Sequence, residues 1–354
     1  MRALSHLDRK KRGTVNRYPN LVPTDVDFRR ITEAAVEQGE RIRQVAKAAA
    51  DGMRNLFLIG CGGSLNDFSA ASYQCDRSAG FPTFCLNSEE FNRRRPALLG
   101  SGSVVLVASH NGTTGETIEA ARWSRSAGAR VIGFTKDETT KLAPECDEVF
   151  TYHSDRTILA PKQVLIGLMV TALLREAGAK LDFAALEQAF AAVPAAFELA
   201  VQEAEARLHE IATDFAAETL TYVLSAGPNQ GAGYGFAMCY LMEMQWKHAS
   251  WFNANEFLHG AFEVVQPDTA VLLFKGEDET RPVINRVEAF LNKNTRRCRV
   301  IDSMDYSLPG VPASMRGDIS PLLLSTLSKR LAEHYQAVTG HSLTDRRYMF
   351  KTTY

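Results

Sequence analysis

The chain has 354 residues, of which 45% are hydrophobic and 23% charged, so it is long enough for two ordinary domains with packed cores. Its formal net charge of −1 provides no overall basic field of the kind that attracts nucleic acid. The six cysteines are scattered without a C-x-x-C pair, which argues against a zinc ribbon or a disulfide framework and favours a reducing compartment. No apolar run reaches membrane-spanning length without a polar break. We therefore expect a cytoplasmic protein without nucleic-acid or membrane partners.

The first half of the chain alternates between helical and strand patterns. Residues 1–25 contain a basic cluster but no apolar segment, so we interpret them as a solvated N-terminal arm and not a secretory signal. The alternation that follows predicts a parallel sheet wrapped by helices. Expected helices cover 26–51, 65–79 and 117–127, and expected strands cover 55–60, 83–86, 103–108, 130–135 and 149–152.

The second half repeats this alternation loosely. Residues 157–216 are expected to be mostly helical, with Pro194 dividing 183–193 from 197–215. Strands are then expected at 220–225, 269–274 and 299–302, and helices at 233–247, 282–292 and 319–338. The pattern predicts two α/β domains, at 26–180 and 181–340, followed by a tail at 341–354.

Two loops rich in glycine and hydroxyl side chains follow strands of the first domain, at 61–64 and 109–117. Ligands of open parallel sheets bind outside the carboxyl ends of the strands, where helix N-termini favour anions. The loops therefore suit a phosphate, although tight turns with helix caps are the alternative. Neither loop has the spacing of a dinucleotide or Walker motif, so we expect the phosphate to belong to a small substrate. Lys162, at the start of a later helix, is either a further anion ligand or a solvated lysine.

One acidic side chain interrupts an apolar helix at Glu243, sixteen residues before His259. A carboxylate in such surroundings should have a raised pKa, which suits a general base near neutral pH. The alternative is a structural salt bridge to Lys247, four residues later. His259 is expected on a turn, as the partner of this acid in proton transfer or as a hydrogen-bonded core histidine. His248 is a weaker second candidate.

These motifs together resemble the sugar isomerase (SIS) domain family. The phosphate motif of the family matches 61–64 and 109–117, and its Glu…Glu-Phe-x-His-Gly pattern matches Glu243 and the block 256–260. The resemblance implies two tandem SIS domains, each a parallel sheet flanked by helices in a flavodoxin-like three-layer sandwich. It also implies a homodimer that needs no metal and no cofactor.

Within that family the chain is similar to two groups. It resembles the isomerase half of glucosamine-6-phosphate synthase, but Tyr240 occupies the position of the lysine that precedes the catalytic glutamate there, which argues against a synthase. The greater likeness is to the fructosamine-6-phosphate deglycases, through 241–246, 255–260 and the terminal motif Asp345-x-Arg347-Tyr348. Ala261 replaces the proline that usually follows His-Gly in that group.

The resemblance to the deglycases implies a reaction and a set of site residues. The enzyme would cleave a 6-phosphofructosyl amino acid, a phosphorylated Amadori product, to glucose 6-phosphate and the free amino acid or amine by proton transfer through an enaminol. Glu243 and His259 would be the catalytic residues. The residues expected to hold the phosphate are Gly62, Gly63, Ser64, Ser109, His110, Asn111, Gly112 and Thr114. Those expected to make further substrate contacts are Lys162, Glu256, Arg347 and Tyr348, with the tail docked near the active site.

Two alternatives stay open at this stage. A glucosamine-6-phosphate isomerase or deaminase would use the same acid and imidazole. A non-catalytic SIS module that senses a phosphosugar would need neither Glu243 nor His259, and the sequence has no helix-turn-helix-like appendage and no basic surface excess. The sequence does not indicate which amino acid forms the other half of the substrate.

Overall fold

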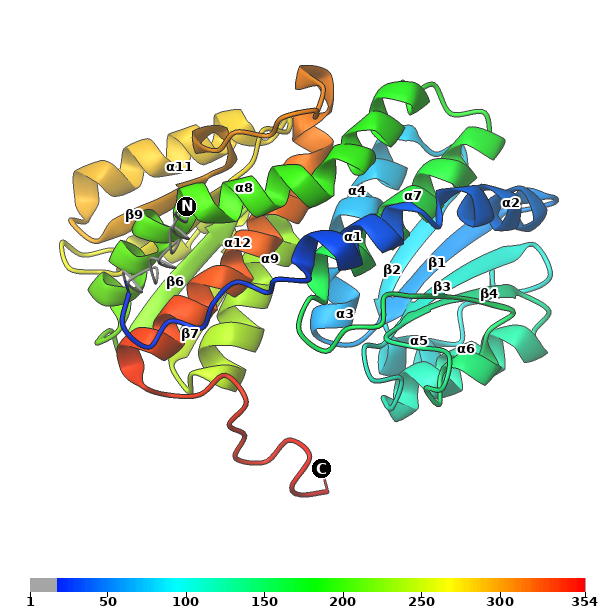
Figure 1. Cartoon of the computed structure of the whole chain (residues 1–354), viewed down its shortest axis with the longest axis horizontal. Coiled ribbons are helices and arrows are strands. Elements are labelled where there is room, and N and C mark those ends of the chain that lie inside the picture. Colours follow the sequence, from blue (N-terminus) through cyan, green and yellow to red (C-terminus); the bar gives the residue numbers. More distant parts are fainter. Residues whose placement is uncertain (1–17, 354) are drawn as a thin grey trace, which may run out of the picture.

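The structure, a computed structural model, describes residues 18–353 and contains two parallel sheets with helices packed against them (Figure 1). The predicted α/β class is confirmed. Strands β1–β5 fall within the expected first domain and β6–β9 within the second. The exact boundary between the domains stays a prediction, because α8 (Phe183–Phe215) packs against α1 (Phe28–Val36) of the first domain and against α12 (Arg316–Thr339) of the second. Most of the expected N-terminal arm, residues 1–17, lies outside the described residues.

The first sheet has five parallel strands in the order β2-β1-β3-β4-β5. Its strands are β1 (Asn55–Gly60), β2 (Thr83–Asn87), β3 (Ser103–Ala108), β4 (Arg130–Thr135) and β5 (Glu148–Thr151). Every residue of β1 and β3 is buried, because helices cover both faces of the sheet. These continuous apolar runs made β1 and β3 predictable from the sequence, and the other three strands of this sheet were also predicted.

The second sheet has four parallel strands in the order β7-β6-β8-β9. Its strands are β6 (Leu220–Ser225), β7 (His248–Asn253), β8 (Val271–Lys275) and β9 (Cys298–Asp302). Strand β7 was not predicted, because it lies at the edge of the sheet and its half-exposed residues lack the apolar run of a central strand. Its carboxyl end leads directly into the block that contains His259.

Besides α1, α8 and α12, the α-helices of the described residues are α2 (Gly39–Ala50), α3 (Gly63–Asn66), α4 (Ser69–Ser78), α5 (Ser88–Arg94), α6 (Gly115–Ser126), α7 (Leu159–Glu176), α9 (Gln230–Gly235), α10 (Ala254–Phe257) and α11 (Arg281–Asn294). The helix expected over 233–247 is instead α9 followed by a π-helix, η3 (Phe236–Met244). Wide π-turns carry no separate signature in the spacing of apolar residues. They are often found at functional sites.

Three predictions about helix continuity are wrong. The segments 26–51 and 65–79 each form two helices, α1 with α2 and α3 with α4. Pro194 does not divide the segment 183–215, which forms the single 33-residue helix α8. Proline removes one backbone hydrogen bond from a helix interior and crowds the preceding turn. Here Pro194 is buried between Val193 and Ala196, and apolar packing along the helix, mostly against α12, offsets that cost (Figure 1).

Among the described residues, only α8 is long and apolar enough to cross a membrane by length and composition. Half of its most apolar window is buried inside the fold, and a core helix passes the same test. In Figure 1 the helix runs alongside α12 through the middle of the molecule.

Candidate active site

The two predicted phosphate loops meet at one edge of the first sheet. Strands β1 and β3 are hydrogen-bonded neighbours with Gly60 opposite Ala108, so the loops that follow them start side by side. The Ser109 and Thr114 hydroxyl oxygens are 3.1 Å apart. Gly112 has a φ of 59°, and a Cβ at this position would overlap the side chain of Thr140. The loop therefore needs glycine there for both its backbone angle and its packing.

Lys162 reaches this edge from the first turn of α7. Its Nζ lies 2.6 Å from Oδ2 of Asp67 and donates a 3.4 Å hydrogen bond to the Ser64 hydroxyl. The lysine and aspartate side chains are 3% and 2% exposed, so each neutralises a charge that would be costly to bury alone. Sequence reasoning placed Lys162 near the site but missed its partner Asp67, which lies 95 residues earlier in the chain. Because the pair is neutral overall, the loops offer an anion mainly hydroxyl and backbone N–H groups.

His110 belongs to the second of these loops, where its imidazole is neutral. Its Nδ1 is 2.7 Å from the Tyr152 hydroxyl, and its Nε2 is 3.7 Å from Asp155. Burial, assisted by the positive charge of Lys162, lowers the pKa of His110 to about 4. At neutral pH this ring can exchange hydrogen bonds with a ligand but adds no charge. Asn111, the next residue, is exposed.

Glu243 lies near the end of η3 and pairs with the C-terminal tail. Its Oε1 is 2.9 Å from Nη2 of Arg346, and both side chains are mostly buried. Burial raises the pKa of Glu243, while the charge and hydrogen bond of Arg346 oppose that shift. The alternative partner, Lys247, donates its Nζ to the backbone carbonyl of Glu218 at 3.4 Å. The sequence therefore anticipated a poorly hydrated carboxylate but not the cation that compensates it.

Cys239 connects Glu243 to the phosphate loops. It precedes Glu243 by four residues on η3, and a Cβ placed on Gly63 would lie 3.8 Å from its Sγ. Burial raises the pKa of the Cys239 thiol to about 12, and the charges of Glu243, Asp67 and Lys162 also act on it. The carboxylate of Glu243 and the loop at Gly63 therefore belong to one region where the two sheets' elements meet.

His259 and Glu256 do not line the cavity of Glu243 within one chain. Both are exposed, on α10 and the turn after it, and the His259 backbone N–H donates to the carbonyl of Glu256 at 2.9 Å. The cavity around Glu243 has a volume of about 750 Å³, and neither His259 nor any residue of the two phosphate loops lines it. Within one chain, His259 is therefore not part of the wall of the Glu243 cavity.

The tail packs along the end of η3. The Gln245 side chain donates to the backbone carbonyl of His341 at 2.8 Å, and the His341 ring lies 4.4 Å from the Trp246 ring. The guanidinium of Arg347 lies 4.2 Å above the Trp246 ring. Tyr348, the next residue, is 69% exposed. The tail therefore brings Arg346 to Glu243 and Arg347 to the same cavity.

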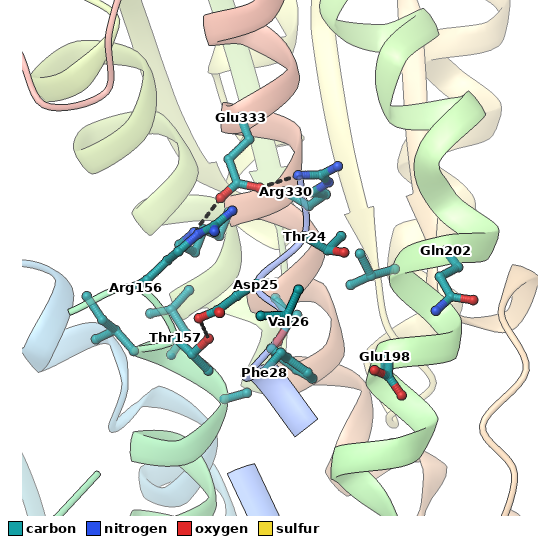
Figure 2. A pocket seen from close by; sticks show the side chains of 16 residues that line it. Thr24, Asp25, Val26, Phe28, Arg156, Thr157, Glu198, Gln202, Arg330 and Glu333 are labelled. Atoms are coloured by element: carbon teal, nitrogen blue, oxygen red, sulfur yellow. Dashed lines mark hydrogen bonds and ion pairs between the residues drawn. The ribbon is translucent and has the colours of Figure 1, made fainter. Parts of the chain in front are cut away.

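A second cavity, of about 350 Å³, lies between the segment before α1, the start of α7, and helices α8 and α12 (Figure 2). Several of its charged groups have partners within the wall: Asp25 accepts a hydrogen bond from the Thr157 hydroxyl at 2.6 Å, and Glu333 forms ion pairs with Lys329 and Arg330. None of the residues predicted for the site lines it. The Glu243 cavity and the phosphate loops are therefore the stronger candidate.

Other residues at the sheet edge were missed because their contacts join distant segments. Asn87 ends β2 opposite Gly60 and donates to the Cys61 thiol at 3.7 Å. The Ser88 and Thr117 hydroxyls are 2.9 Å apart. The only available signal was position, since residues 87 and 88 directly follow a predicted strand. Their side chains place hydrogen-bonding groups next to the loop at Cys61.

Known proteins share both the fold and much of the sequence. Residues 52–174 match the family model of the SIS domain. Over 310 residues the chain is 31% identical to the fructosamine deglycase FrlB of Bacillus subtilis, across 85% of this chain and 92% of that protein. It is 24% identical over 335 residues to the fructoselysine 6-phosphate deglycase of Escherichia coli, across 91% and 96%. A solved Bacillus subtilis structure assigned as a phosphosugar isomerase superposes with a TM-score of 0.83 at 27% identity, covering 91% of this chain and 99% of that one.

Proposed function

Because this chain is an enzyme of the SIS domain family, we propose that it is a deglycase that hydrolyses a 6-phosphofructosyl amino acid to glucose 6-phosphate and the free amino acid. The observation that carries the proposal is the buried carboxylate of Glu243, joined through Cys239 to a loop suited to phosphate. A relative that is 31% identical over most of its length is a fructosamine deglycase, which supports the same chemistry here.

The loops of the first sheet hold the phosphate in this proposal. Hydroxyls of Ser64, Ser109 and Thr114 and the side chains of His110 and Asn111 donate to its oxygens. Gly62, Gly63 and Gly112 allow the backbone to approach. The Lys162–Asp67 pair fixes the position of Ser64. Such anchoring fixes the sugar chain relative to Glu243, which lowers the entropic cost of the chemical step.

Glu243 moves a proton between two neighbouring carbons. In the ring-opened substrate, its carboxylate removes a proton from C1, between the amine nitrogen and the C2 ketone, while the C2 oxygen gains a proton to give the enaminol. Protonation of C2 then leaves an imine at C1. Water adds to C1, the carbon–nitrogen bond breaks, and the nitrogen leaves as the protonated amine with the C1 aldehyde of glucose 6-phosphate as the other product. The balance is one substrate and one water for two products.

His259 completes the site in this proposal, from a second copy of the chain. It assists ring opening and proton transfer at the sugar oxygens. Its exposure within one chain leaves it available to a neighbouring molecule. We accordingly propose a cytoplasmic homodimer, with Glu256 and Tyr348 as further substrate contacts beside it.

A substrate screen tests the proposed function. The pure enzyme is incubated with 6-phosphofructosyl adducts of lysine, glutamine, asparagine and glycine, and in parallel with glucosamine 6-phosphate. We expect glucose 6-phosphate from at least one adduct. Ammonia release from glucosamine 6-phosphate, without turnover of any adduct, would instead identify a deaminase.

A further inference from the structure

The cavity around Glu243 contains more positive than negative side chains. Three cations, Lys247, Arg346 and Arg347, line it beside the single carboxylate of Glu243, together with His248. Arg346 pairs with Glu243. In the part of the chain that the structure describes, no carboxylate lies within ion-pair distance of Lys247 or Arg347. Lys247 and Arg347 can therefore form ion pairs with an anionic group of a ligand.

The two unpaired cations are held in place by neutral partners. The Arg347 guanidinium stacks on the Trp246 ring at 4.2 Å, which leaves the edge of its fork free to donate hydrogen bonds. Lys247 is half-buried and donates to one backbone carbonyl. Since Trp246 follows Glu243 by only three residues, the end of η3 presents the proposed base and these cations together.

The phosphate does not account for this surplus of positive charge. At the phosphate loops Lys162 is neutralised by Asp67, and the depressed pKa of His110 keeps its ring neutral. The loops offer an anion neutral donors, whereas the cations line the cavity of Glu243, which in the proposed reaction acts at C1, the carbon that carries the amine. That amine is itself cationic when protonated, so cations around it would repel the adduct of a simple amine. A carboxylate next to the amine reverses this balance.

We propose that Arg347 and Lys247 bind the carboxylate of the amino-acid half of the substrate, so that the enzyme selects adducts of α-amino acids over adducts of simple amines. The inference rests on the proposed deglycase function. In an α-amino acid the carboxylate is attached to the carbon beside the glycated nitrogen. It therefore lies close to C1 and within the cavity that holds Glu243.

A near-isosteric substrate pair tests this assignment. The values of kcat/KM are measured for 6-phosphofructosyl-glycine and 6-phosphofructosyl-glycinamide, which differ in a carboxylate against a neutral amide. We expect the wild-type enzyme to prefer the acid by about tenfold or more, the usual range for a charge-assisted hydrogen bond. In the Arg347→Gln variant the ratio of kcat/KM for the acid to that for the amide should fall about tenfold, through a higher KM for the acid. The Arg347→Lys variant should keep part of the preference.

The decisive quantity is the change in the acid-to-amide ratio, because the two adducts also differ in the basicity of their nitrogen. Lys293→Gln, which removes a positive charge from the exposed surface of α11, should leave that ratio unchanged. Equal turnover of acid and amide, or an equal loss of both in Arg347→Gln, would overturn the carboxylate site but leave the deglycase function intact. Failure of the wild-type enzyme to release glucose 6-phosphate from either adduct, or from those of lysine, glutamine and asparagine, would overturn both.

Discussion

At the scale of single residues, Glu243 is the side chain whose chemistry is most sensitive to its surroundings. Glu243→Gln keeps the shape of the side chain but removes the proton acceptor. We expect kcat to fall on the order of 10²- to 10⁴-fold, the usual contribution of a general base. Substrate binding should change little, because the phosphate loops are untouched. Full activity of this variant on every 6-phosphofructosyl adduct tried would rule out Glu243 as the base.

The pH dependence of activity follows from the same residue. Burial raises the pKa of Glu243 above its ordinary value of 4.5, and a base acts only when ionised, so kcat/KM should rise with pH through that raised pKa. Arg346 holds the pKa down, since its positive charge favours the carboxylate. Arg346→Gln should therefore move the acid limb of the profile to higher pH. A limb that stays in place or moves to lower pH would contradict the pairing of these two residues.

At the scale of secondary-structure elements, the loop after β3 depends on one glycine. Gly112→Ala adds the strain of a positive φ to a collision with Thr140. Left-handed strain and overpacking together predict a loss of about 2–4 kcal/mol in the free energy of unfolding, with a raised KM for the phosphosugar. Gly178→Ala is the matched control, since Gly178 has a φ of 76° and no atom within 4 Å of the added Cβ. It should lose only about 1–2 kcal/mol. If urea unfolding shows the same loss of unfolding free energy in both variants, the Thr140 side chain moves aside at little cost.

The elements that the sequence predicted share one physical property, which is a strong local pattern. Strands such as β1 and β3 are continuous apolar runs, and the glycine and hydroxyl side chains after them mark the phosphate loops. The failures depend on context instead. Packing between segments distant in the chain sets three features that were not predicted: the edge position of β7, the π-turns of η3 and the continuity of α8 through Pro194. For the same reason Asp67 was not predicted as the partner of Lys162, since no spacing rule connects residues so far apart in the chain.

At the scale of the whole molecule, the arrangement of Glu243 and His259 raises the question of how many chains form one site. Each chain carries the phosphate loops and Glu243, which Cys239 connects, while His259 lies exposed on the turn after α10. The proposed proton transfer requires both groups around one substrate. In a symmetric dimer with a two-fold axis, each exposed turn would reach the other chain's cavity, and two equivalent sites would result.

Complementation between two inactive variants tests this arrangement. Glu243→Gln and His259→Ala chains are mixed, unfolded and refolded together, or co-expressed with different tags. If sites are shared, a heterodimer has one site with both lesions and one intact site. Random pairing then gives heterodimers in half of the molecules, so activity should return to about a quarter of the wild-type value. If each chain used its own His259, every site would carry a lesion. Activity would then stay at the level of the separate variants even though purification by both tags recovers heterodimers, and His259 would have to reach Glu243 by a movement within one chain.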